Sequence, residues 1–111
     1  MVQAKGRSFP HAPAEWTPED AVLRARQEKL ELSEDHWEML RALQEFFARH
    51  DSAPAINKRE LHHALEEKFH VKGGLRYLYE IFPAGPVAQG CRLAGLKVPE
   101  GAIDKAFGSV S

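Results

Sequence analysis

The sequence predicts a mainly α-helical domain, a compact bundle of about five helices. Two observations carry this prediction: apolar residues recur at three- and four-residue spacing, and helix-start residues stand directly before these patterns. Proline and glycine separate the patterned segments. With 111 residues, 43% of them apolar and 28% charged, the chain has the size and composition of one globular domain.

The first segment, residues 1–15, contains prolines and glycine and predicts an irregular or hairpin-like lead-in. A helix then begins at Pro18 and runs to about Lys29. Thr17 can cap it, proline suits its first position, and two acidic residues follow where the helix dipole favours negative charge.

The second and third helices carry the clearest apolar stripes. One helix runs from Ser33 to about Arg49, and another begins after Asn57, which can cap it. The apolar residues of the two stripes are Trp37, Leu40, Leu43, Phe46 and Phe47, followed by Leu61, Ala64, Leu65 and Phe69.

A glycine pair separates the third helix from a fourth, predicted over Leu75–Phe82. Because this segment is apolar on nearly all sides, we expect it to be the central, buried helix. A short fifth helix from Pro86 to about Ala94 carries Cys91. The expected division is a lead-in over 1–15, a helical domain over 16–95 and a flexible C-terminal arm over 96–111.

Charge and composition exclude several partners and compartments. The net charge is −1 and the pI is near 6.6, so no global attraction to nucleic acid or to an anionic membrane is expected. No segment has the apolar length of a signal peptide or a membrane span, and a single cysteine cannot form an internal disulfide. We therefore expect a cytoplasmic protein, monomeric unless two copies join through Cys91.

The residues disfavour two kinds of site, a metal site and a DNA-reading helix. Histidine–glutamate pairs at 62 and 66 and at 63 and 67 have the spacing of metal ligands, but no third ligand can be placed, so no metal is expected. The segment 34–80 resembles a helix-turn-helix DNA reader superficially. Its reading helix would present only Arg76 and Glu80, which disfavours nucleic acid as a partner. No phosphate loop, dinucleotide motif or hydrolase triad is present, so no cofactor is expected.

Cys91 is the one candidate for chemistry. It shares a helical stripe with Val87 and Ala94, which is typical of a small buried apolar side chain. The alternative is a sulfur-accepting thiolate activated by the neighbouring Arg92, in a segment where glycines at 90 and 95 permit close approach of a partner. The residues alone do not distinguish a buried structural cysteine from a sulfur-accepting thiolate.

Four stretches carry a resemblance to a known family: L-S-E-D-H-W-E at 32–38, P-A-I at 54–56, Y-L-Y-E-I-F-P-A-G-P at 77–86 and C-R-L-A-G-L at 91–96. With these stretches the chain resembles the DsrC/TusE family of sulfur-relay proteins. The resemblance implies a helical domain with a small N-terminal β-hairpin and a flexible C-terminal arm. It also implies sulfur carried on cysteine thiols of that arm, and partners that are sulfur-transfer or sulfite-reductase-type proteins.

The chain departs from the family pattern at the arm. In that pattern the main sulfur-carrying cysteine is penultimate and a second cysteine lies eleven positions before it. Cys91 matches the second one, whereas Ala102 stands at the first and nine further residues, 103–111, follow. Sulfur bridged between two thiols of one chain is therefore excluded.

Three functions remain open at this point. Cys91 alone could carry sulfur or form mixed disulfides, making the chain a sulfurtransferase-like carrier without an independent catalytic site. The chain could instead be a non-transferring homologue that docks on sulfur-metabolism partners, with Cys91 a structural residue. The third is a DNA-associated transcription regulator, for which the sequence shows no basic face.

Overall fold

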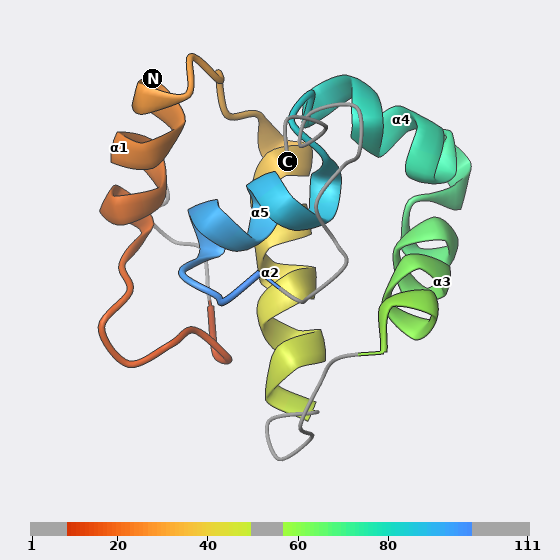
Figure 1. Ribbon diagram of the computed structural model, residues 1–111, viewed down its shortest axis with the longest axis horizontal. Helices are drawn as coiled ribbons and strands as arrows, with labels where there is room; N and C mark the ends of the chain where they lie inside the picture. Colours follow the sequence, from red (N-terminus) through yellow and green to blue (C-terminus); the bar gives the residue numbers. More distant parts are fainter. Residues whose placement is uncertain (1–8, 50–56, 99–111) are drawn as a thin grey trace, which may run out of the picture.

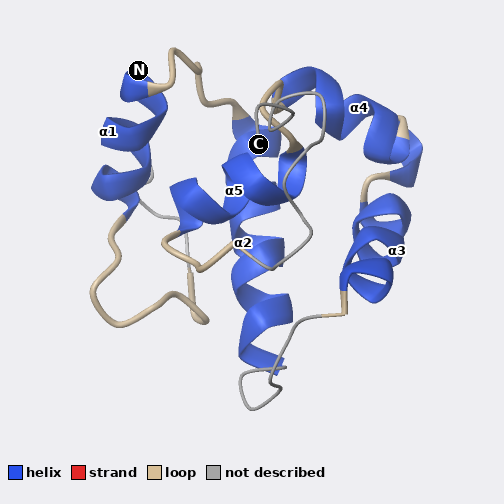
Figure 2. Ribbon diagram, viewed as in Figure 1, coloured by secondary structure: helices blue, strands red, loops and turns tan. Residues whose placement is uncertain are grey.

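The computed structural model describes residues 9–49 and 57–98. Figure 2 shows these residues as helices joined by loops, with no strand among them. In chain order the elements are α1 (Pro18–Gln27), α2 (Glu34–Arg49), α3 (Lys58–Lys68), the 3₁₀ turn η1 (His70–Lys72), α4 (Gly74–Ile81) and α5 (Pro86–Ala94). The prediction of a mainly α-helical protein with five helices is confirmed.

The predicted helix starts rest on local capping. The Thr17 side chain accepts the backbone N–H of Asp20, and the Asp20 carboxylate accepts the N–H of Thr17, which completes a capping box at α1. Asn57 Oδ1 likewise accepts the N–H of Glu60 at 3.0 Å, at the start of α3. Both caps were expected, because they depend only on residues three positions apart.

The helices are arranged around α5, which crosses the long helix α2 in the middle of the molecule (Figure 1). In this view α1 lies on one side of that pair and α3 and α4 lie on the other. The helix α5 packs against α1, α2 and α4, whereas α3 packs mainly on α4 and η1. The last helix in the described chain is thus the one that joins α1, α2 and α4.

The centre of the molecule differs from the prediction. In α4 only Gly74 and Leu78 are buried, and Tyr79 is 45% exposed, so the expectation that 75–82 is the central helix was wrong. In α5 every residue except Arg92 is buried. The reason is side-chain size: a Cβ on Gly90 would lie 2.7 Å from Leu43 Cδ1, so α5 approaches α2 more closely than a helix with bulky residues at that face could.

The two ends of the chain reach beyond the described residues. Residues 9–17 form turns, in which the N–H of Ala12 donates to Phe9 O and the N–H of Trp16 donates to Pro13 O. The rest of the expected hairpin, residues 1–8, and most of the expected arm, residues 99–111, lie outside the described part. No helix in that part is long and apolar enough to cross a membrane.

Candidate functional site

Cys91 lies in the last turn of α5 and is fully buried, with 0% of its surface exposed. It belongs to the main apolar core, together with residues of α1, α2, α3 and α4. Burial raises the pKa of the Cys91 thiol to about 12, and the charge of Arg92 opposes this increase only in part. In this conformation Cys91 is a protonated, enclosed thiol, and a disulfide between two copies cannot form through it.

Arg92 does not activate the thiol as its adjacency in sequence suggested. Its guanidinium forms two hydrogen bonds with Glu28 at the end of α1, Nε to Oε2 at 3.0 Å and Nη2 to Oε1 at 2.9 Å. Gln89 Nε2 donates to the same carboxylate at 2.8 Å. The hydrogen bonds from Arg92 lower the pKa of Glu28, and Glu28 raises that of Arg92. The guanidinium therefore joins α1 to α5.

The C-terminal end of α5 is held by side chains from distant parts of the chain. Trp16 Nε1 donates to Leu93 O at 2.8 Å, and Gln44 Nε2 donates to Ala94 O at 2.9 Å. Gly95 then ends the helix in the left-handed region, with φ 78°, and the N–H of Leu96 donates to Cys91 O at 2.9 Å. The chain beyond α5 therefore leaves from a well-defined point at Gly95, one helical turn after Cys91.

A surface groove of about 410 Å³ lies beside this point, between α1 and the end of α5. Trp16, Leu93 and Gly95 line one part of it, and Leu23 of α1, which is 57% exposed, lines another. The start of the arm thus has exposed apolar surface next to it.

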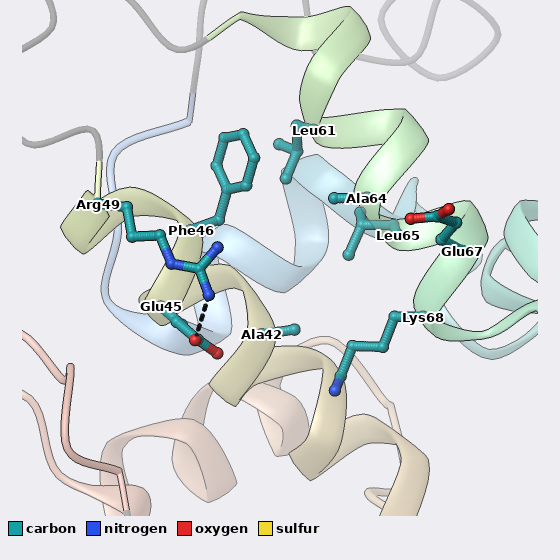
Figure 3. A pocket seen from close by; sticks show the side chains of 9 residues that line it. All are labelled: Ala42, Glu45, Phe46, Arg49, Leu61, Ala64, Leu65, Glu67 and Lys68. Atoms are coloured by element: carbon teal, nitrogen blue, oxygen red, sulfur yellow. Dashed lines mark hydrogen bonds and ion pairs between the residues drawn. The ribbon is translucent and has the colours of Figure 1, made fainter.

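A second groove, of about 510 Å³, separates α2 from α3 (Figure 3). Phe46, Leu61 and Leu65 form apolar walls, and the ion pair between Arg49 and Glu45 lies on the α2 side. The opposite rim carries Lys68. No residue of this groove is near Cys91 in sequence, and no pattern in the sequence indicated the groove.

The histidine–glutamate pairs do not assemble into a metal centre. Glu66 instead accepts the backbone N–H of Leu75 at 2.9 Å, at the start of α4, and pairs with His70. In residues 9–49 and 57–98 no group of three or more potential ligands comes together.

A polar cluster that the sequence did not indicate joins α2 to η1 and α4. Asp35 accepts hydrogen bonds from Lys72 Nζ, at 2.8 Å, and from the hydroxyl of Tyr77. These bonds lower the pKa of Asp35 and raise the pKa of Tyr77 to about 12. Lys72 and Tyr77 lie 37 and 42 positions from Asp35, so no local pattern could have revealed the cluster.

A family model and known proteins of similar sequence all relate this chain to the same family. The family model described as "DsrC like protein" matches residues 2–103. A sulfurtransferase TusE of Photorhabdus laumondii is 36% identical over 99 residues, which cover 88% of this chain and 87% of the relative. A sulfurtransferase TusE of Salmonella typhimurium is 43% identical over 86 residues, or 77% of each chain.

A solved structure agrees with these relatives. The NMR structure of Allochromatium vinosum DsrC superimposes with a TM-score of 0.65 at 35% identity, covering 92% of this chain and 96% of that one. The sequence match and the shared fold extend over the same helices that surround Cys91. This chain belongs to the DsrC-like protein family.

Proposed function

We propose that this chain is a sulfur-relay protein of the DsrC/TusE type, whose partners are sulfur-transfer proteins. The observation that carries the proposal is the family match, which spans residues 2–103 and includes the helix carrying Cys91. Relatives at 36–43% identity are named as sulfurtransferases. Within this function the helical body is the docking part, and residues 96–111 act as the arm.

We further propose Cys91 as the sulfur-accepting group, because it is the only thiol in the chain. In the reaction the Cys91 thiolate attacks the outer sulfur of a donor persulfide. The sulfur–sulfur bond of the donor breaks, a new one forms on Cys91, and the donor leaves as a thiolate that takes up a proton. Only the thiolate reacts, so the buried thiol must first become exposed and ionised.

The burial of Cys91 explains why a partner is part of the proposal. With its pKa raised to about 12 by burial, only a very small fraction of the thiol is ionised near neutral pH. A partner that opens the end of α5 would both expose the sulfur and return its pKa to an ordinary value. Sulfur transfer would then be confined to the complex, which protects the thiol from unrelated oxidants.

The test is intact-mass spectrometry of reduced protein after incubation with a low-molecular-weight persulfide. The native chain, the native chain in denaturing urea and the Cys91→Ala variant are compared. We expect slow addition of sulfur to the native chain, fast addition in urea and none to the variant. If the native chain gains no sulfur even when the donor is a persulfide-loaded sulfurtransferase, while the unfolded chain is fully modified, the carrier role fails and docking alone remains as the function.

A further inference from the structure

The last two carbonyl groups of α5 have an unusual environment for a helix end. The carbonyls of a final helical turn have no partner within the helix and usually bind water. Leu93 and Ala94 are 1% and 0% exposed, so water is excluded from them. Trp16 Nε1 and Gln44 Nε2 supply the missing donors, at 2.8 Å and 2.9 Å. Two distant side chains thus complete the last turn of α5.

Gln44 is specialised for this one contact. It is 1% exposed, and its Oε1 atom is buried with no hydrogen-bond partner in the described structure. A buried acceptor without a partner is destabilising, so an apolar residue of similar volume would suit the surrounding core better. The N–H group of Gln44, which donates to Ala94 O, therefore explains why an amide side chain stands at position 44.

Trp16 makes a second contact with the same turn. A Cβ atom on Gly95 would lie 2.6 Å from Trp16 Cδ1, so the indole lies directly against the residue at which the chain leaves α5. The turn that the indole covers begins with Cys91, whose own carbonyl accepts the N–H of Leu96. The hydrogen bonds that join α2 to α4, from His36 to Ile81 and from Tyr77 to Asp35, involve neither Trp16 nor Gln44.

We infer that Trp16 and Gln44 are positioning residues that close the last turn of α5 over Cys91 and set the access of reagents and partners to this thiol. The inference rests on the proposed function, because it assigns the regulation of the proposed sulfur-accepting group. A partner that displaces the indole from Gly95, or competes for the Ala94 carbonyl, would open the turn. The adjoining groove, which both Trp16 and Gly95 line, is where such a partner would enter.

The experiment measures the rate at which iodoacetamide alkylates Cys91 in the folded chain. Gln44→Met removes one donor and nearly keeps the size of the side chain, whereas Trp16→Phe removes one donor and leaves a single aromatic ring in place of the indole. Tyr77→Phe is the matched control, because it removes one long-range hydrogen bond, to Asp35, away from the end of α5. Global unfolding free energies of all four proteins are measured by urea titration in parallel.

We expect Trp16→Phe and Gln44→Met to increase the alkylation rate about fivefold to tenfold each, as expected for the loss of one hydrogen bond. Tyr77→Phe should lower the global stability yet leave the alkylation rate unchanged. In the native chain the rate should also be nearly independent of low urea concentrations, which is the signature of local opening.

An equal increase in Tyr77→Phe, or a native alkylation rate that follows global unfolding in urea, would overturn the inference. The urea dependence needs only the native chain, so it can overturn the inference even where a variant does not fold. Alkylation reports access alone and does not depend on sulfur chemistry. Variants that are alkylated faster but take up no sulfur from a persulfide would refute the carrier role and leave the positioning role of Trp16 and Gln44 intact.

Discussion

Glu28 and Arg92, separated by 64 positions, form a two-point ion pair that joins the end of α1 to the end of α5. Gln89 adds a third hydrogen bond to the same carboxylate, and its own Oε1 accepts the N–H of Ala84 at 3.2 Å. The pair is largely sheltered, since the two side chains are 18% and 29% exposed. It therefore contributes more than a fully solvated ion pair would.

Glu28→Gln should lower the free energy of unfolding by about 2 kcal/mol, the usual worth of hydrogen bonds to a charged group. The hydrogen bonds from Arg92 depress the pKa of Glu28 below its ordinary 4.5, so the folded state favours the ionised form. The stabilisation is complete above pH 4.5 and is lost as the pH falls through the lower folded value. Urea titrations between neutral and acidic pH would show this loss. Glu31→Gln, at an exposed position, is the control and should leave the curve unchanged.

Gly95→Ala should destabilise the fold by about 2 kcal/mol, as a left-handed residue acquires a Cβ atom. The new atom would also lie 2.6 Å from Trp16 Cδ1, so the indole must shift. Thermal unfolding measures the loss of stability, and the fluorescence of Trp16 in a Trp37→Phe background reports the shift. Unchanged stability and unchanged fluorescence would contradict the geometry given for the end of α5.

His36 should make the protein less stable in mildly acidic solution. Its Nδ1 accepts the N–H of Ser33 at 2.9 Å, which requires the proton to be on Nε2, 2.7 Å from Ile81 O. Burial lowers the pKa of His36 from its ordinary 6.5, so the unfolded chain binds the proton more tightly than the folded one. Stability is therefore complete above pH 6.5 and decreases as the pH falls from there toward the lower folded value.

The measurement for His36 is the unfolding free energy of the native chain and of His36→Gln across this pH range. The decrease should disappear in the variant. His63→Gln changes an exposed histidine and should retain the decrease in full. Identical pH dependence in all three proteins would show that His36 is not the group responsible.

Tyr77 should ionise with a pKa of about 12, because its hydroxyl donates to the Asp35 carboxylate and a phenolate there would meet a negative charge. The chain has two tyrosines, so Tyr79→Phe leaves Tyr77 as the only one. Tyrosinate absorbance after a rapid pH jump should then show a midpoint near 12. Adding Asp35→Asn should move the midpoint toward the ordinary value of 10. A midpoint that does not respond to Asp35→Asn would mean that the hydrogen bond is absent in solution.

The helices and the residues at which they start could be predicted from neighbouring residues in the chain. Thr17 and Asn57 cap their helices through residues three positions away, and α5 ends at Ala94, where the sequence predicted its end. The family could also be identified from four short stretches, because their residues and order are specific. All of these features depend on neighbours in the chain.

Which helix is central and how deeply Cys91 is buried depend on contacts between residues that are far apart in the chain. Apolar composition suggested 75–82 as the central helix. The central helix is α5 instead, because Gly90 has no Cβ atom and leaves room for Leu43 of α2. Arg92, the neighbour of Cys91 in sequence, turns to Glu28 instead of supporting a thiolate. The pKa of a thiol depends on its exposure to water and on the charges around it. For Cys91 both are set by α1, α2 and α4, which are distant in the chain.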